Sequence, residues 1–292
     1  MAARKKLIVP FLLPSVLMIG LFFIYPAVQT VIISFQDWHG TFRTFGWNGL
    51  GNYQKLFSDP NFVSSVTHTF NYFLISAVLL FPLALFLGVA LQRVKKGKSL
   101  LQFCIFMPVT LSVTVAAVLW KWYIYDPNMG IVNSLLRGIG LDSLTNAWLG
   151  NSKTAMVCLI ITSCWHGVAT WVIMLISGLD RIPPDLMEAA RMDGANEMTV
   201  FFKITLPLLW EVLSSLIVMS FIGCMQQFPV VFAMTQGGPY GSTELMGTYL
   251  YKIAFEGRQF SYGSAMSIVM LVIILVASTF GNKFLKTEPI EY

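Results

Sequence analysis

Charged residues are scarce in this chain. Asp, Glu, Lys and Arg make up 11% of its 292 residues, and 56% of the residues are hydrophobic. An ordinary soluble domain carries about 25% charged residues. The scarcity of charge therefore excludes a soluble globular domain and indicates an integral membrane protein.

Motifs for enzymatic chemistry are also missing. There is no P-loop, so a nucleotide would have to bind another polypeptide. Glu211 is the one acid close to the interior of an apolar run, and it has no second carboxylate beside it. The cysteines lie in apolar runs without CxxC or Cys/His spacing, which indicates neither disulfides nor a metal site; they are Cys104, Cys158, Cys164 and Cys224. We expect no catalytic residues, no metal and no cofactor on this chain.

Long stretches free of Asp, Glu, Lys and Arg are abundant instead. Six of them are long enough to cross the hydrocarbon core of a bilayer as helices. They predict an all-α integral membrane protein with six transmembrane helices, at about residues 8–35, 69–92, 100–121, 155–179, 208–232 and 262–283. We find no internal repeat and expect one transmembrane domain over residues 1–292.

Positive charges set the expected orientation. Arg4, Lys5 and Lys6 precede the first apolar run, which predicts a cytoplasmic N-terminus and, after six spans, a cytoplasmic C-terminus. The connection between the second and third spans fits the same orientation, since it carries Arg93, Lys95, Lys96 and Lys98. The first run is too long for the apolar region of a signal peptide, so we expect it to remain as a span. This distribution explains the net charge of +5 and gives no reason to expect nucleic acid as a partner.

A polar stretch, residues 185–209, lies between the fourth and fifth apolar runs. Two prolines before it argue against helix upstream, and Asp185 followed three residues later by Glu188 fits a capping box. These signals predict a short helix from Leu186 to about Asp193.

The residues after that helix predict a turn and a second helix. Gly194 suits a left-handed residue that ends the first helix. Asn196 or Thr199 can begin another, which Pro207 interrupts where the fifth span begins. We therefore expect a helix, turn, helix unit within a cytoplasmic connection at 181–207.

The charge of this unit argues for a protein as its partner. Its acids outnumber its bases, whereas a helix on an anionic lipid surface normally presents Lys and Arg. Ala189 and Ala190 are small enough for the close approach of another surface, and Glu188 can meet an Arg or Lys. Leu186 and Met187 supply apolar contacts. The alternative is an amphipathic connector that only closes the end of the helix bundle.

The same stretch resembles the EAA signature of ATP-binding-cassette (ABC) importer permeases, which is Glu-Ala-Ala, three residues, Gly and then Ile-x-Leu-Pro. The signature is carried here by Glu188, Ala189, Ala190, Gly194, Ile204, Leu206 and Pro207. Further similarity extends along nearly the whole chain, in YPAVQTVIISF, GLGNYQKLFSDPNF, GIVNSLL, WLG, TQGGPYGST and FSYGSAMS. Together these segments look like the carbohydrate-uptake branch, similar to the maltose-transporter F-type permease without its extra N-terminal spans and large outer loop.

The resemblance implies a type I ABC importer permease fold, with cytoplasmic coupling helices between spans four and five. Residues in the coupling role would be Leu186, Met187, Glu188, Ala189, Ala190, Asp193 and Gly194. The implied partners are a second homologous permease, two cytoplasmic ABC ATPase subunits that hold ATP and Mg, and an extracytoplasmic sugar-binding protein. The implied location is the bacterial or archaeal cytoplasmic (inner) membrane. The resemblance favours a heterodimer of permeases, and the sequence leaves two identical chains open.

Polar and aromatic residues inside spans are the first candidates for a transport pathway. The fourth span offers a stripe along one helix face, made of Ser163, His166, Gly167, Thr170 and Trp171. The fifth offers Ser220, Gly223, Cys224 and Gln227. Hydroxyl, amide and imidazole groups beside an indole suit a neutral sugar, and the resemblance favours the same two spans.

These residues have other readings. Ser163, Gly167 and Ser220 can serve helix packing, the commonest role of small residues in membranes. His166 can be a hydrogen-bond partner between helices. No Arg or Lys lies deep in any span, which disfavours a phosphorylated or strongly anionic substrate.

We therefore predict the permease subunit of an ATP-driven importer for a sugar or oligosaccharide. A permease for another small polar solute, such as a polyol or a glycerol phosphate ester, is an alternative. A membrane-embedded sugar transferase would need acidic or metal-binding groups near one face, which the sequence lacks. A channel or sensor would not need the unit at 181–207.

Overall fold

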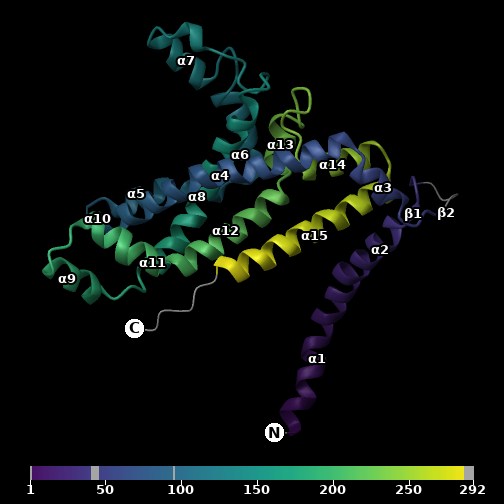
Figure 1. The fold of residues 1–292 in the computed structure, drawn as a ribbon, viewed down its shortest axis with the longest axis horizontal. Helices are drawn as coiled ribbons and strands as arrows, with labels where there is room; N and C mark the ends of the chain where they lie inside the picture. Colours follow the sequence, from purple (N-terminus) through teal and green to yellow (C-terminus); the bar gives the residue numbers. More distant parts are fainter. Residues whose placement is uncertain (1, 41–45, 95, 286–292) are drawn as a thin grey trace. The chain divides into compact units, whose positions relative to one another are not determined.

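A computed structural model describes residues 2–40, 46–94 and 96–285 of the chain, and the described part is mostly helical, with two short strands (Figure 1). It divides into two compact units. One comprises residues up to 63 together with 249–273, and the other comprises 64–248 together with residues from 274 onward. The expectation of a single domain stays a prediction.

The first unit contains long apolar helices joined to a small polar framework. Its elements are α1 (Ala2–Ile19), η1 (Gly20–Ile24), α2 (Tyr25–Ser34), β1 (Gln36–Asp37), β2 (Gly46–Trp47), α3 (Gly51–Phe57), η6 (Lys252–Glu256) and the first half of α15 (Phe260–Leu285). The two described strands pair antiparallel, with Gln36 opposite Trp47. The Asn52 amide donates to the carbonyls of Ser34 (2.9 Å) and Gln36 (2.8 Å) and so holds the end of α2 against α3.

The second unit contains the polar stretches that the sequence analysis singled out. Its elements are α4 (Pro60–Arg93), α5 (Lys98–Phe106), η2 (Met107–Thr110), α6 (Val113–Leu119), η3 (Trp120–Ile124), α7 (Ile131–Gly138), η4 (Asp142–Leu144), α8 (Ala155–Leu179), α9 (Pro184–Met192), α10 (Glu197–Val200), η5 (Phe201–Thr205), α11 (Leu206–Leu208), α12 (Trp210–Met225), α13 (Pro229–Met234) and α14 (Met246–Tyr251). The boundary with the first unit falls within α4, α14 and α15.

Helix α8 forms the core of the second unit. It contacts α5, α6, α12 and α13. Half of its most apolar window is buried within the chain, whereas none of the corresponding window of Phe11–Ser34 is. A long helix whose surface is mostly apolar needs mostly apolar surroundings. Helix α8 finds them in its own chain, and Phe11–Ser34 requires lipid or another subunit.

Four helices in the described chain are long and apolar enough to cross a membrane, and the number rises to six if each of two bent pairs is one span. The four are Phe11–Ser34, Pro60–Arg93, Ala155–Leu179 and Phe260–Leu285. They overlap four of the six expected spans, and Ala155–Leu179 has the expected bounds.

The expected third and fifth spans are not continuous helices. The third breaks at Leu111 and Ser112, with a bend of 100° between its halves. The fifth follows a bend of 64° at Leu209, and its helix ends at Met225 instead of continuing to 232. Prolines explain these positions, because Pro108 and Pro207 lie within the turn before each bend and Pro229 begins the next helix.

The polar unit between α8 and α12 forms two helices and a turn, but its first helix begins differently from the expectation. Helix α9 starts at Pro184, and no side chain caps it. The predicted capping box of Asp185 and Glu188 is therefore wrong, since proline itself occupies the first helical position, where its missing N–H costs nothing.

The turn and the second helix agree with the sequence. Gly194 has φ +83°, the left-handed conformation that ends a helix. Asn196 caps α10, and its side-chain oxygen accepts a hydrogen bond of 2.8 Å from the Thr199 N–H. Figure 1 shows α9 and α10 near the C-terminal end of α4.

Candidate functional site

A cavity of about 350 Å³ lies in the second unit, between α4, α6, α8 and α12. Every residue that the sequence analysis proposed for substrate contact lines it, namely Ser163, His166, Gly167, Thr170, Trp171, Ser220, Gly223, Cys224 and Gln227. The volume falls in the range of small-molecule sites, which is about 300–1,000 Å³. The two polar stripes, predicted separately on two helices, therefore face one space.

Three polar side chains from different elements meet in this cavity. The Tyr72 hydroxyl, on α4, donates to the Ser163 hydroxyl on α8 at 2.6 Å. The Gln227 amide, just beyond α12, lies 3.3 Å from the Tyr72 oxygen and 3.5 Å from the Ser163 oxygen. These hydrogen bonds satisfy the three polar groups in apolar surroundings. The same groups can instead form hydrogen bonds with the hydroxyls of a ligand.

His166 joins the cavity to the break in the third span. Its Nε2 lies 3.0 Å from the carbonyl oxygen of Leu111. That carbonyl can only accept, so Nε2 is the donor, and in the neutral ring Nδ1 is an acceptor. A broken helix leaves carbonyls without partners in its own ladder. His166 thus makes the hydrogen bond between helices that the sequence left open, and it also lines the cavity.

Trp171 lines the cavity, although it is largely buried. Its exposed fraction is 8%, and Phe81 meets it edge to face, with the ring centroids 4.4 Å apart. This contact fixes the orientation of the indole. Stacking of a sugar on Trp171 stays a prediction.

Sequence reasoning missed the contribution of α4. The cavity is also lined by Tyr72, Ser76, Leu80, Val113, Cys164, Met174, Leu216 and Met219. A signal existed for Tyr72 and Ser76, because the polar residues Ser65, Thr69, Tyr72 and Ser76 recur at intervals of four, three and four, from just before the expected second span into its first half. They form one helix face, and all four are buried.

The described lining of this cavity contains no Asp, Glu, Lys or Arg. A neutral polar ligand can exchange hydrogen bonds with its hydroxyl, amide and imidazole groups, whereas an anion would be desolvated without a cationic partner. The same composition leaves no carboxylate for acid–base chemistry on a ligand held there.

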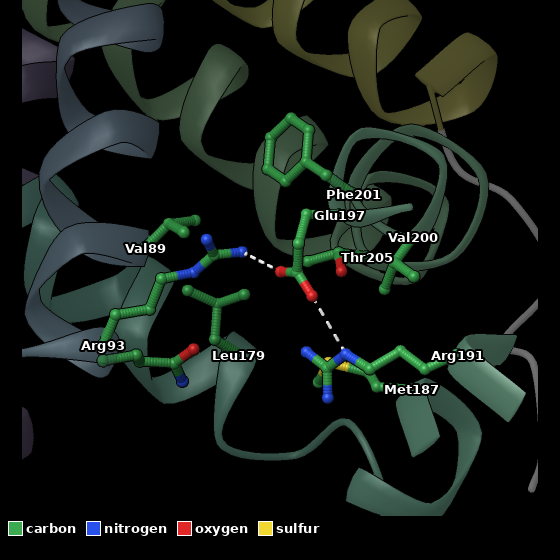
Figure 2. Close-up of a pocket in the computed structure, with 10 residues that line it drawn as sticks. Val89, Arg93, Leu179, Met187, Arg191, Glu197, Val200, Phe201 and Thr205 are labelled. Carbon is green, nitrogen blue, oxygen red and sulfur yellow. Dashed lines mark hydrogen bonds and ion pairs between the residues drawn. The ribbon is translucent and has the colours of Figure 1, made fainter. Parts of the chain in front are cut away.

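A second, smaller cavity of about 220 Å³ lies where α4, α8, α9 and α10 meet (Figure 2). Figure 2 shows Glu197 between two arginines that reach it from different helices. Arg93 Nη2, from α4, lies 2.6 Å from Glu197 Oε2, and Arg191 Nε, from α9, lies 2.9 Å from Oε1. Each carboxylate oxygen therefore has its own guanidinium partner. All three side chains are about half exposed.

The residues expected to meet an ATPase lie on both sides of α9. Leu186, Glu188 and Ala189 are exposed, as are Asp193 and Gly194 at the turn. Met187 and Ala190 are partly buried, and Met187 lines the smaller cavity and packs against the core of its own chain. The exposed set is available to a partner, and the coupling role of all seven stays a prediction.

Known proteins resemble this chain over nearly its full length. Residues 80–286 match the family described as binding-protein-dependent transport system inner membrane component. The probable ABC transporter permease protein YurN of Bacillus subtilis is 37% identical, and the match covers 99% of each chain. The multiple sugar-binding transport system permease protein MsmF of Streptococcus mutans is 31% identical over 96% of this chain and 93% of its own.

A solved structure has the same fold. It is the crystal structure of a bacterial ABC transporter involved in the import of the acidic polysaccharide alginate, in which one chain matches with a TM-score of 0.85 and 23% identity, over 97% of this chain and 96% of that one. The family match covers more than half of the sequence, and both relatives exceed 30% identity. The chain therefore belongs to the binding-protein-dependent transport system inner membrane components and is an ABC transporter permease, a multi-pass transport subunit.

Proposed function

We propose that this permease translocates a neutral sugar or oligosaccharide that an extracytoplasmic binding protein delivers to it. The observation that carries the proposal is the large cavity, whose lining combines hydroxyl, amide and imidazole groups with an indole and has no charged side chain among its described residues. A neutral ligand rich in hydroxyl groups matches that lining. The name of the Streptococcus mutans relative, a multiple sugar-binding transport system permease, supports the same substrate class.

The proposal extends to the partners. The exposed face of α9, with Glu188 and Ala189, would enter a groove of a cytoplasmic ABC ATPase. ATP and Mg would bind there, and this chain would hold no cofactor. A second, homologous permease would complete the membrane part, as a heterodimer.

The proposed orientation has both termini in the cytoplasm. The Arg93–Glu197 pair brings the end of α4, where the basic connection to α5 begins, next to the α9–α10 turn. These two connections would then lie on one side of the membrane. The abundance of Lys and Arg in the first of them supports the cytoplasmic side.

Two alternatives are less well supported. A glycerol phosphate ester would bring a negative charge into a lining that offers no cation among the described residues, and this costs more than placing a neutral sugar there. A polyol fits the chemistry of the cavity but leaves the face of Trp171 without a ring to stack on. A sugar transferase would need a carboxylate or a metal near the ligand, and the described lining has neither acid nor metal-binding cluster.

Uptake into proteoliposomes tests this function. The complex would be isolated through a tag on this chain, reconstituted, and supplied with the binding protein encoded nearest to it. We would measure uptake of radiolabelled arabinotriose, diacetylchitobiose and glycerol 3-phosphate. The expected result is uptake of a neutral oligosaccharide that requires both ATP and the binding protein. Uptake of glycerol 3-phosphate alone, or uptake without ATP, would contradict the proposal.

A further inference from the structure

Helix α9 has few direct contacts with the rest of its own chain. The structure describes this helix in full, and none of its side chains is buried. Covalent connections join it to α8 through residues 180–183, and to α12 through α10, η5 and α11. A displacement of α9 therefore reaches those two helices directly through the backbone.

Helix α4 has no such backbone connection to α9 and depends on side-chain contacts. Both described ion pairs in this region meet at Glu197, which binds Arg93 of α4 and Arg191 of α9 (Figure 2). The hydrogen bond from Arg191 and its charge lower the pKa of the Glu197 carboxyl, and Arg93 adds to the effect. The carboxylate is thus ionised at neutral pH, and both pairs are present. Gln92 adds a hydrogen bond of 3.0 Å from α4 to Asp180 at the end of α8.

The same helix reaches the large cavity. Helix α4 is continuous from Pro60 to Arg93, and Tyr72, which donates to Ser163 in that cavity, lies on it. The rise of an α-helix, about 1.5 Å per residue, separates Tyr72 from Arg93 by roughly 30 Å. Helix α4 keeps one continuous helical backbone over that length, with Pro82 inside it, so a displacement of Arg93 has a direct path to Tyr72 and its partner on α8.

We propose that Glu197 is a positioning residue that ties α4 to the α9–α10 turn, so that movement of α9 is carried along α4 to the cavity. The inference rests on the proposed function of this chain as an ATP-driven permease. It assigns the coupling to two features, the exposed face of α9 and the ion pair between Glu197 and Arg93.

The two ion pairs have separable roles. Arg191 and Glu197 are six residues apart, and their pair braces the turn itself. Arg93 and Glu197 are 104 residues apart, and their pair is the one that leaves the turn. Arg93→Gln removes the link to α4 and retains the brace, whereas Glu197→Gln removes both.

The test compares transport with ATP hydrolysis in the reconstituted complex. The quantity measured is the number of sugar molecules imported per ATP hydrolysed, with the labelled oligosaccharide that the wild-type complex imports fastest. We would compare wild type, Arg93→Gln, Glu197→Gln and the double variant. Glu211→Gln is the matched control, because Glu211 lies exposed in the first turn of α12. We expect ATP hydrolysis to persist and the ratio to fall about two- to fivefold in each test variant, the range that exposed ion pairs support. The double variant should be no worse than Glu197→Gln alone.

Salt dependence gives a readout that a purely structural role would not move. Exposed ion pairs weaken as salt is raised. The ratio of sugar imported to ATP hydrolysed should therefore fall with ionic strength in the wild type and should not fall in Glu197→Gln.

If the Glu197→Gln complex does not assemble, the Arg93→Gln variant alone tests the inference, because it retains the Arg191–Glu197 pair within the turn. An unchanged ratio in an assembled Arg93→Gln complex would overturn this inference while leaving the proposed function intact. A wild-type complex that imports no sugar would overturn the proposed function, and the inference with it.

Discussion

Tyr72 on α4 and Ser163 on α8 are joined by a hydrogen bond of 2.6 Å inside the large cavity. The contact links the helix that ends beside the α9–α10 turn to the helix at the core of the second unit. It also adds Tyr72, which was not predicted from the sequence, to the lining of the candidate substrate site.

Tyr72→Phe should weaken substrate use without impairing assembly. The change removes the donor to Ser163 and the group that the Gln227 amide reaches, at similar volume. A net hydrogen bond is worth about 1 kcal/mol, so we expect KM for sugar uptake to rise about two- to tenfold. Uptake kinetics would measure this, with Tyr123→Phe, at an exposed position, as the control. An unchanged KM would place the substrate elsewhere.

Gln227→Ala should also weaken or redirect sugar uptake while basal ATP hydrolysis continues. The neighbouring Gln226 is exposed and does not line the cavity, so Gln226→Ala is the matched control. We expect a loss of several-fold in uptake affinity for Gln227→Ala, as for one lost hydrogen bond, and a smaller effect for the control. Equal effects of the two variants on uptake of the panel sugars would argue against this cavity as the site.

Trp171→Ala should lower uptake of ring-containing sugars more than uptake of a linear polyol such as sorbitol. The indole lines the cavity, and stacking on a pyranose face requires that ring. Competition by unlabelled sorbitol and diacetylchitobiose would measure the preference. Because Phe81 packs on the indole, thermal unfolding of the complex must be followed in parallel. An unaltered preference in a stable variant would remove stacking from the proposal.

Glu188→Lys should abolish transport while the protein still inserts in the membrane. Glu188 is exposed on α9, so the reversal disturbs a partner surface more than the chain's own packing. Like charges juxtaposed at an interface cost several kcal/mol, so we expect uptake to fall more than about tenfold. Ala189→Leu gives an independent probe, because Ala189 is exposed whereas Ala190 is partly buried. If the Glu188→Lys permease still co-purifies with normal amounts of the ATPase and still imports sugar at the full rate, α9 is only a connector between α8 and α12.

Asn196→Ala should loosen the start of α10 and reduce coupling. The Asn196 oxygen caps the helix that begins with Glu197. Loss of such a cap costs about 1 kcal/mol. Asn196→Asp keeps an acceptor at that position, so it should restore the ratio of sugar imported to ATP hydrolysed. A failure of aspartate to restore it would assign another role to the asparagine.

Much of the fold follows from local properties of the chain. The bounds of α8 agree with a run that contains no charge, and the left-handed Gly194 and the cap at Asn196 agree with local turn and cap preferences. The start of α9 was missed because Pro184 competes with Asp185 for the same role, and proline at the first helical position does not need a capping side chain. The interruption of the helix at Pro207 was expected and is confirmed by the bend at Leu209, whereas the break near Leu111 was not expected, because a proline in a membrane helix is compatible with both a mild kink and a break.

The sequence by itself determined that the chain is a multi-span membrane protein and which stripes are polar, because apolar length and helical period depend only on neighbouring residues. It also carried the EAA spacing. Tertiary structure alone decided that the two stripes share one cavity, that Tyr72 joins them, and that Glu197 receives two arginines. Those contacts connect residues up to 155 positions apart, and such pairings depend on how whole helices pack.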